Sequence, residues 1–277
     1  MTRLTEYSRG PHTFDVIDAG PEDGTPVVLL HGFPQRATCW DAVAPLLHQA
    51  GARTYAPDQR GYSPRARPRS RFSYRVGEVI DDAKALIDQV GQPVHVVAHD
   101  WGAMVGWGLA ARYPEVVRSL TAVSVGHPAA FMRSMLRSTQ GLKSYYMALF
   151  QLPFVTEWLL SRRGGLGERL LRNAGMSREM LDTYFTEIVE DGALRGGLGW
   201  YRSLPISLRG DYFRRVSVPT TLLWSTNDVA LGRKQAELTR DFVTGPYELV
   251  EMDGASHWIP DQEPKQLAEV IIARAAL

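Results

Sequence analysis

The sequence of 277 residues has only one cysteine, Cys39, so it can form no internal disulfide and no metal site built from several thiolates. It also lacks a hydrophobic stretch of the roughly 20 residues that a transmembrane helix needs. Residues 1–10 are polar and do not contain the apolar core of a signal peptide. From these absences we expect a protein that does not span a membrane and that is located in the cytoplasm.

An excess of charge of either sign is also absent. The chain has 31 basic and 30 acidic residues, with a net charge of +1, and this balance argues against a nucleic-acid or polyanion partner. A local excess of arginine is formed by Arg60, Arg65, Arg67, Arg69, Arg71 and Arg75. This segment either binds phosphate groups or forms a solvated loop, and its prolines and scarce aromatic residues favour the loop.

The remaining composition is that of an ordinary globular protein, with 44% hydrophobic and 22% charged residues. Strand-like and helical patterns alternate over the first 125 residues and again after about residue 220, which predicts a mostly parallel sheet flanked by helices. We expect strands over 13–19, 27–30, 53–56, 93–98, 119–125, 220–225 and 247–252, and the clearest helices over 74–90, 101–113 and from 264 onward.

Between these two α/β parts lies a long segment with helical patterns only, rich in Leu, Met, Tyr and Trp. It extends from about residue 128 to residue 212. We therefore divide the chain into the first part of an α/β core (1–128), an inserted all-helical lid (129–212) and the second part of the core (213–277).

Asp100 is the expected nucleophile. The strand that starts at Val94 runs into Ala98-His99-Asp100-Trp101-Gly102, and a helix follows at once. Small residues on both sides of a central side chain are the spacing of a nucleophile elbow, which lifts that side chain out at the carboxyl end of the sheet. The helix N-terminus behind the turn favours a negative charge there. The alternative is that Asp100 only caps the helix.

Two further residues follow in the order of a catalytic triad. Asp228 comes after the strand at 220–225, and His257 comes after the strand at 247–252. Nucleophile, acid and histidine in this chain order is the α/β-hydrolase arrangement. Upstream, the loop that contains Phe33 follows a buried strand, and its backbone N–H groups are candidates for an oxyanion hole. Without such roles, Asp228 is a turn residue and His257 a loop histidine.

Five motifs in the same order make the chain resemble the α/β-hydrolase superfamily over nearly its whole length, and most closely its epoxide hydrolase branch. They are His31-Gly32-Phe33-Pro34, Asp58-Gln59-Arg60-Gly61-Tyr62-Ser63, Ala98-His99-Asp100-Trp101-Gly102, Asn227-Asp228 and Gly254-Ala255-Ser256-His257-Trp258.

This resemblance implies that two lid tyrosines donate hydrogen bonds to the oxirane oxygen. The segment 144–153 is similar to the part of the lid that carries the first tyrosine, and the alignment points to Tyr146, with its neighbour Tyr145 as a further substrate contact. Gly199-Trp200-Tyr201-Arg202 is similar to the family's Trp-Tyr-Arg segment, so Tyr201 is the second. The alternative is that all three tyrosines only pack inside the lid.

The resemblance also implies a mechanism. Asp100 opens the epoxide and forms an alkyl ester, and His257, oriented by Asp228, then activates water to hydrolyse it. The backbone N–H groups of Phe33 and Trp101 hold the oxyanion, and their side chains are expected to contact the substrate. The expected partners are a small lipophilic epoxide and water, the product is a vicinal diol, and no metal or organic cofactor is required.

Two other functions stay open, namely dehalogenation and ligand binding without turnover. A haloalkane dehalogenase uses the same aspartyl ester, and the Trp101 indole suits a halide. That family typically has Asn or another Trp as the second halide donor, whereas the position after His31-Gly32 is Phe33 in this chain. Fluoroacetate dehalogenases place arginines after the nucleophile, where this chain has Trp101, Ala103 and Met104. A ligand-binding protein without turnover would not need the intact set of Asp100, Asp228 and His257.

Three other charged or titratable residues near these motifs are expected to have structural and not catalytic roles. His31 and His99 flank the site and are expected to orient its loops. Arg60 is expected to form an internal ion pair. The sequence does not indicate an oligomeric state.

Overall fold

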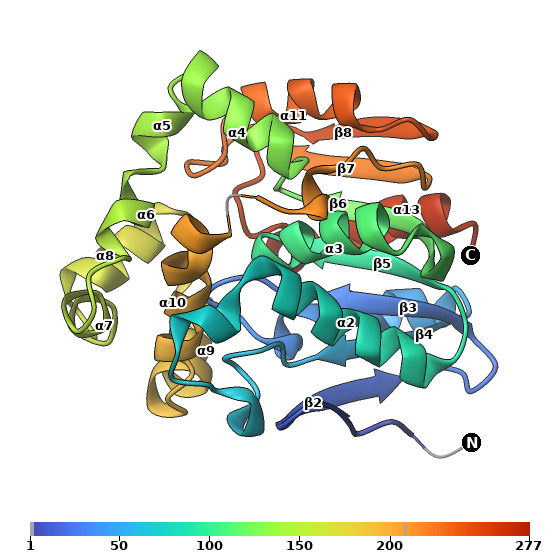
Figure 1. The fold of residues 1–277 in the computed structure, drawn as a ribbon, viewed down its shortest axis with the longest axis horizontal. Coiled ribbons are helices and arrows are strands. Elements are labelled where there is room, and N and C mark those ends of the chain that lie inside the picture. The colour runs from blue at the N-terminus through green and yellow to red at the C-terminus, as the bar shows by residue number, and fades with distance from the viewer. Residues whose placement is uncertain (1–2, 208) are drawn as a thin grey trace.

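The computed structural model describes residues 3–207 and 209–277, which fold around one eight-stranded sheet (Figure 1). The strand order is β1-β2-β4-β3-β5-β6-β7-β8. β2 pairs antiparallel with β1 and β4, and all neighbours from β4 to β8 are parallel, which confirms the predicted mostly parallel sheet. The strands are β1 (Glu6–Arg9), β2 (His12–Ala19), β3 (Thr25–Leu30), β4 (Ala52–Pro57), β5 (Val94–His99), β6 (Val117–Val123), β7 (Thr220–Ser225) and β8 (Tyr247–Met252).

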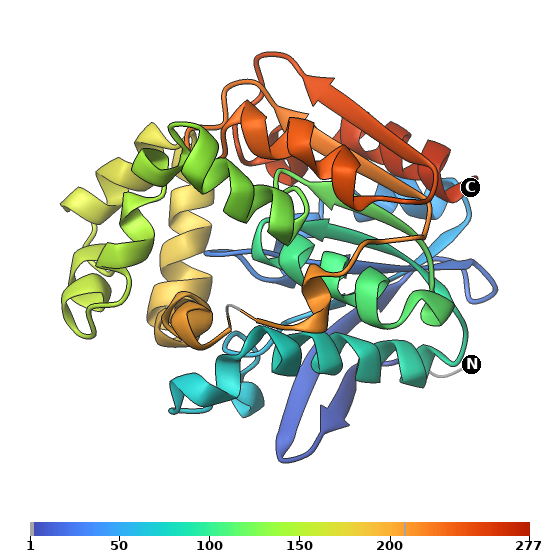
Figure 2. The ribbon, with the colours of Figure 1, turned by 45° about the horizontal axis from the view of Figure 1, so that its top comes forward.

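Helices cover the sheet on both faces, and the strand sequences reflect this. In β3, Val27 and Leu29 belong to the core on one face and Val28 and Leu30 to the core on the other, because successive side chains of a strand alternate. α1 (Ala44–Gln49) and α13 (Pro264–Ala275) contribute to the first core, and α2 (Val76–Val90) and α3 (Trp101–Arg112) to the second. Figures 1 and 2 show α2 and α3 on one side of the sheet and α13 on the other. Continuous apolar runs such as Val27–Leu30 are thus required by burial on both faces.

Shorter elements connect these layers. The remaining helices outside the lid region are α11 (Arg233–Thr239) and α12 (Ile259–Gln262). Single 3-10 turns are η1 (Ala37–Trp40), η2 (Pro64–Ala66), η3 (Arg71–Tyr74), η4 (Pro114–Val116), η6 (Leu204–Ile206), η7 (Asp211–Phe213) and η8 (Arg240–Phe242).

In the first half of the chain, several expected strands differ from the structure in their bounds; for example, the strand expected over 119–125 is β6, which ends at Val123. Two other elements differ more clearly. The helix expected over 74–90 begins at Val76, because Tyr74 belongs to η3 and Arg75 has an extended backbone with ψ 140°. β1 was not expected, since it is a four-residue edge strand whose mostly polar sequence has no alternating apolar pattern.

Between β6 and β7 the regular secondary structure of the described residues is helical, apart from one bridge that Val216 forms with Val243, a residue beyond β7. They are α4 (Pro128–Arg137), α5 (Gln140–Lys143), α6 (Tyr145–Leu149), α7 (Val155–Leu160), α8 (Leu166–Asn173), α9 (Arg178–Tyr184), the π-helical turn η5 (Phe185–Glu190) and α10 (Leu194–Ser203). α5 to α10 lie beyond one end of the sheet, at the left of Figures 1 and 2, whereas α4 packs along α11. We propose that residues 129–212 form one unit, and we call it the cap.

The backbone of the cap packs against the backbone of the core at two glycines, Gly61 and Gly196. A Cβ atom on Gly196 of α10 would lie 2.1 Å from the carbonyl oxygen of Gly61, so neither position has room for a side chain. Beside this contact, the indole N–H of Trp200 donates to the carbonyl oxygen of Arg60 at 2.7 Å. Backbone therefore packs directly on backbone here, and α10 is fixed to the loop that follows β4.

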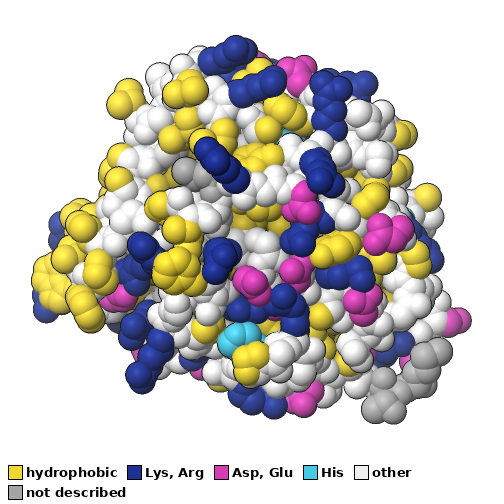
Figure 3. All heavy atoms as spheres, viewed as in Figure 1, with side chains coloured by type: hydrophobic (Ala, Val, Ile, Leu, Met, Phe, Trp, Pro, Cys, Tyr) yellow, Lys and Arg dark blue, Asp and Glu magenta, His cyan; other side chains and the backbone are white. Residues whose placement is uncertain are grey.

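Three arginines of the arginine-rich segment, Arg60, Arg65 and Arg67, form ion pairs within the protein, whereas Arg69 and Arg71 are exposed. Arg60 is buried and forms a two-pronged ion pair with Asp82, with N–O distances of 2.6 and 2.7 Å. Arg65 contacts Glu6, and Arg67 pairs with Asp191 of the cap. On the face in Figure 3, Lys and Arg side chains are interspersed with Asp and Glu side chains. The buried ion pair of Arg60 with Asp82 confirms the internal ion pair predicted for Arg60. Among the described residues no helix is long and apolar enough to cross a membrane.

The buried pair of Arg60 and Asp82 generates a stability prediction. We expect Asp82→Ala to lower the free energy of unfolding by about 3–5 kcal/mol, because the guanidinium would stay buried without its carboxylate. Urea denaturation followed by circular dichroism measures this loss. The matched control on the same helix is Asp88→Ala, which removes an exposed pair with Lys84 and should cost less than about 1 kcal/mol. Equal losses in the two variants would contradict the prediction.

Candidate active site

Asp100 occupies a strained turn between β5 and α3. Its backbone angles, φ 51° and ψ −118°, lie in a region that residues other than glycine rarely adopt. Two glycines make room for this turn: a Cβ atom on Gly102 would lie 2.2 Å from the carbonyl oxygen of Leu30, and one on Gly32 would lie 2.4 Å from the Cβ of Asp100. The small residues of the motif are therefore required by close packing, and the turn has the geometry of a nucleophile elbow.

The carboxylate of Asp100 is held by groups from two other loops. The backbone N–H of Phe33 donates to Oδ1 at 2.8 Å, and Nε2 of His257 lies 3.5 Å from Oδ2. Burial alone raises the pKa of Asp100, but the hydrogen bond and charge of His257, together with the N–H of Phe33, outweigh burial and lower it. Asp100 is thus ionised at neutral pH, the form that a nucleophile needs.

His257 and Asp228 form a short, buried pair. Nδ1 of His257 lies 2.7 Å from Oδ2 of Asp228, while Oδ1 of Asp228 accepts hydrogen bonds from the backbone N–H groups of Ala230 and Leu231, both at 2.8 Å. Burial lowers the pKa of His257, but the charges of Asp228 and Asp100 and their hydrogen bonds raise it to about 10. The structure therefore brings the three predicted triad residues together in the order Asp100, His257, Asp228.

His31 and His99 lie beside these residues without facing the substrate side. Nε2 of His31 accepts the backbone N–H of Gln59 at 3.1 Å, and Nε2 of His99 lies 3.0 Å from the carbonyl oxygen of His257. Burial lowers the pKa of each to about 4, so both rings are neutral. The His31 ring connects the loop after β3 to the loop after β4, and the His99 ring connects the end of β5 to the loop that carries His257, which are the structural roles expected for them.

Tyr146 of α6 and Tyr201 of α10 face Asp100 across one cavity. Their ring centroids are 6.0 Å apart, and both rings line the cavity together with Asp100 and Trp101. Burial raises the pKa of both phenols well above the usual value, and the negative charge of Asp100 adds to the rise; a hydrogen bond with Trp101 opposes it only in part at Tyr201. Both tyrosines are therefore neutral hydrogen-bond donors.

Tyr145 does not contact this cavity, which corrects the expectation for it. Its side chain is 60% exposed, and the described residues that line the cavity include Tyr146 and not Tyr145. The physical reason is the helical phase: neighbouring residues in a helix point about 100° apart, so an inward Tyr146 turns Tyr145 outward.

Phe33 and Trp101 were both expected to contribute a backbone N–H and a side-chain contact with the substrate, but in the structure only Trp101 has its side chain at the cavity. Phe33 contributes its N–H to Asp100, but its ring packs against Tyr201 and Phe150, with centroid distances of 5.2 and 5.6 Å, and is not among the described cavity-lining residues. A direct substrate contact of the Phe33 ring is therefore not part of this arrangement.

The cavity has a volume of about 240 Å³, and its remaining walls are mainly apolar. Residues missed by the motif search supply much of this lining, among them Met104, Phe131, Met132, Met135, Met147 and Leu231. Some of these lining residues could have been predicted from the sequence. Pro128, Phe131, Met132 and Met135 have the i, i+3, i+4, i+7 spacing of residues on one face of a helix.

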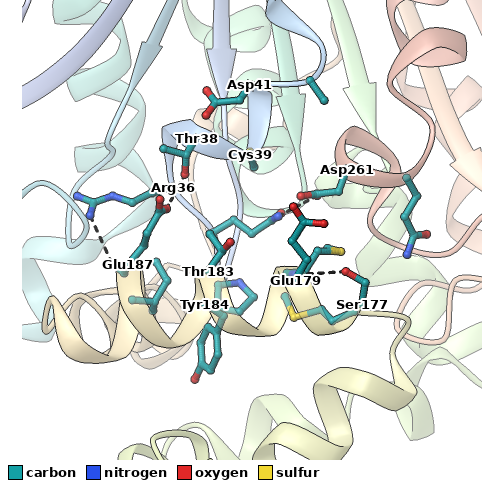
Figure 4. Close-up of a pocket in the computed structure, with 17 residues that line it drawn as sticks. Arg36, Thr38, Cys39, Asp41, Ser177, Glu179, Thr183, Tyr184, Glu187 and Asp261 are labelled. Atoms are coloured by element: carbon teal, nitrogen blue, oxygen red, sulfur yellow. Dashed lines mark hydrogen bonds between the residues drawn. The ribbon is translucent and has the colours of Figure 1, made fainter.

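A second cavity, of about 440 Å³, lies between η1 and the helical segment of α9 and η5 (Figure 4). It is lined by polar side chains, including Arg36, Thr38, Glu179, Glu187 and Asp261, and it contains none of the predicted catalytic residues. Arg36 pairs with Asp58, and Thr38 donates to Glu187. The guanidinium of Arg36 also donates to the carbonyl oxygen of Glu187 at 3.4 Å, and the contacts of Arg36 and Thr38 with Glu187 attach the cap to the core. Within the described part of the chain, no group of three His, Cys, Asp or Glu side chains is placed to hold a metal ion.

Comparisons with known proteins agree with this geometry. The family model described as alpha/beta hydrolase fold matches residues 25–264. The AB hydrolase superfamily protein YfhM of Bacillus subtilis (strain 168) is 35% identical, over 94% of this chain and 93% of that protein. With a sheet, an elbow and a triad in the same order, the chain belongs to the α/β-hydrolase superfamily.

Its relatives also define the branch. Epoxide hydrolase A of Mycobacterium tuberculosis (strain ATCC 25618 / H37Rv) is 32% identical, over 93% of this chain and 92% of that protein. The crystal structure of Epoxide Hydrolase A from Mycobacterium thermoresistibile superimposes with a TM-score of 0.83 at 26% identity and covers 97% of both chains. The chain is a member of the epoxide hydrolase branch, as its aspartate elbow and tyrosine-bearing helices indicate.

The coupling of His257 to Asp100 generates a prediction about protonation. We expect Asp100→Asn to lower the pKa of His257 by roughly 1 to 3 pH units, because the variant removes a negative charge that stabilises the imidazolium. Titration of the imidazole nitrogens by NMR measures the pKa of His257 in the parent protein and in the variant. His127, which is buried beneath Phe242, serves as the internal control and should titrate alike in both proteins. An unchanged pKa of His257 would show that the two groups are not coupled.

Proposed function

We propose that this protein is an epoxide hydrolase that converts lipophilic epoxides into vicinal diols through a covalent ester on Asp100. The observation that carries the proposal is an apolar cavity in which an ionised elbow aspartate faces two neutral phenols. The substrates are a small lipophilic epoxide and water, and the steps below use no metal or organic cofactor. The expected cytoplasmic location stays a prediction.

In the first step, a carboxylate oxygen of Asp100 attacks a ring carbon of the epoxide, and the bond from that carbon to the ring oxygen breaks. The negative charge moves from the carboxylate to this oxygen, which becomes an alkoxide. Tyr146 and Tyr201 donate hydrogen bonds that strengthen as the charge develops, which lowers the barrier more than it stabilises bound substrate. The alkoxide then takes up, by way of solvent, the proton that His257 gives up as its pKa falls, and the products of this step are a neutral hydroxyalkyl ester of Asp100 and a neutral His257.

In the second step, His257 removes a proton from water, and the hydroxide attacks the ester carbonyl carbon of Asp100. A protonated imidazole cannot act as this base, and the charge of Asp100 favours the protonated form. Ester formation removes that charge, so the pKa of His257 falls at the stage when a neutral base is needed. The N–H groups of Phe33 and Trp101 are proposed to hold the oxyanion; collapse releases the diol and restores the carboxylate.

Dehalogenation is the nearest alternative, and the cavity does not favour it. A halide leaves as a weakly basic anion and gains little from two phenols, whereas an alkoxide gains much. Trp101, the candidate halide donor, lines the cavity, but no Asn and no second Trp is among the described residues that line it with Trp101. A panel of styrene-type, aliphatic and fatty-acid epoxides beside chloro- and bromoalkanes, assayed for diol and for halide, separates the two activities.

The covalent route is tested by removing the base. We expect His257→Gln to form the ester and fail to hydrolyse it, so that incubation with an epoxide adds the mass of one substrate to the peptide that carries Asp100. Peptide mass spectrometry detects the adduct. The double variant His257→Gln/Asp100→Asn is the control and should remain unmodified. An unmodified His257→Gln peptide, with substrate shown to bind, would contradict a covalent mechanism.

The role of the two phenols is tested by their removal. Losing one oxyanion-type donor typically slows a reaction on the order of 10²- to 10³-fold. Since two donors share the developing charge, we expect Tyr146→Phe and Tyr201→Phe each to slow ester formation by roughly 100-fold or less, and the double variant nearly to abolish it. Pre-steady-state kinetics should show ester hydrolysis unchanged in the single variants.

Tyr145→Phe is the matched control for this experiment. The side chain of Tyr145 is exposed on the same helix, so its hydroxyl should be dispensable and both rate constants should stay within about twofold of the parent. Parent-like epoxide opening by the Tyr146→Phe/Tyr201→Phe variant would refute the assignment of these two donors.

A further inference from the structure

Gln140, the first residue of α5 in the cap, makes an unusual set of contacts with the core. Its side chain is buried, with 1% of its surface exposed. Its amide nitrogen donates to the carbonyl oxygen of Ala230 at 2.7 Å, and its amide oxygen accepts the backbone N–H of Gly232 at 2.7 Å. The second donor of the amide contacts the hydroxyl of Ser144 at 3.0 Å. One glutamine therefore pairs with two peptide groups of a loop about 90 residues away in the sequence, and every polar group of its side chain is used.

The loop that Gln140 holds carries the acid of the triad. Residues 226–232 form neither helix nor strand, so no regular ladder of hydrogen bonds fixes them. Within the loop, the N–H groups of Ala230 and Leu231 bind Oδ1 of Asp228, and Oδ2 is thereby directed at His257. The peptide groups that orient the carboxylate are thus in the stretch that Gln140 clamps from the other side.

A second cap residue reinforces this contact. Lys143, at the end of α5, donates from Nζ to the carbonyl oxygen of Asp228 itself at 3.2 Å. The cap therefore binds the acid loop at Asp228, Ala230 and Gly232. Leu231, between two of these positions, lines the substrate cavity.

The same part of the cap carries a proposed oxirane donor. α6 begins two residues after α5 ends, and Tyr146 is its second residue. The pocket wall with Tyr146 and the acid loop with Asp228 are therefore joined through one short, hydrogen-bonded segment. A displacement of α5 would stretch the contacts to the acid loop and shift Tyr146 together.

We propose that Gln140 is a positioning residue that couples the cap to the triad: it holds the acid loop so that Asp228 keeps His257 oriented for ester hydrolysis. This inference rests on the proposed two-step mechanism. Because His257 acts as a base in the second step, loss of the tether should affect the two steps unequally. A misplacement of about 1 Å far from the reacting atoms can slow a step by up to about 100-fold.

The test compares the two rate constants in Gln140→Met, which keeps the length of the side chain and removes its amide. We expect ester hydrolysis to slow by roughly 10- to 100-fold and ester formation to stay within about twofold, so that the ester accumulates during turnover. Ser144→Ala is the matched control, because it removes only the contact of Gln140 inside the cap. Both rate constants should stay within about twofold of the parent in this control.

A general loosening of the cap would give a different result. It would displace Tyr146 and slow ester formation at least as much as ester hydrolysis, so equal slowing of both steps in Gln140→Met would overturn the proposal. Unchanged rate constants would overturn it as well. If Gln140→Met does not fold, Lys143→Met removes the contact to Asp228 alone; it should slow ester hydrolysis selectively, and an unchanged rate there would count against the tether.

A second readout does not depend on turnover. The Nδ1–H proton of His257, bonded to Asp228, should give a downfield NMR resonance in the parent protein that is broadened or lost in Gln140→Met. A sharp, unshifted resonance in the variant would overturn the tether, whatever the substrate. A parent protein that forms no ester would instead contradict the proposed function, so the two failures are distinguishable.

Discussion

The buried negative charge of Asp100 influences every titratable group that faces it. It raises the pKa of His257 by stabilising the imidazolium, and it raises the pKa of Tyr146 and Tyr201 by opposing a phenolate. In the free protein it adds to the burial that keeps both phenols neutral, and together with Asp228 it keeps the histidine charged. Esterification removes this one charge and changes all three groups at once. The proposed order of steps thus follows from electrostatics, and no separate signal is needed to switch the histidine from partner to base.

Much of the fold can be read from the sequence because its central strands are buried on both faces. The apolar runs of β3, β5 and β7 leave little choice of structure, and their alternation with helices predicts a parallel sheet. The edge strand β1 escapes such analysis, since a polar strand has no pattern before its partner is known. The backbone contact of Gly61 with Gly196 is also invisible in the sequence, because it joins two segments that are distant along the chain.

The site also contains residues that can be predicted from the sequence and residues that cannot. Asp100, Asp228 and His257 are predictable because each follows a strand, and parallel strands deliver their ends to one edge of the sheet. The choice between Tyr145 and Tyr146 depends on the rotation of a five-residue helix, which a motif does not specify. Gln140 carries no motif at all, since its partners are peptide groups of a remote loop and any sequence there presents the same N–H and C=O groups.

The contact between Gly61 and Gly196 has a consequence for how the substrate range can change. α10 cannot shift there without a clash of backbones, so the wall that carries Tyr201 is rigid. The facing wall is built on α4 and α6 and contains Met132, Met135 and Met147, whose unbranched side chains adapt to differently shaped neighbours. Selection for new substrates, in nature or in a mutant library, is therefore directed to the methionine wall, where size and shape can vary while the geometry of Tyr201 is retained.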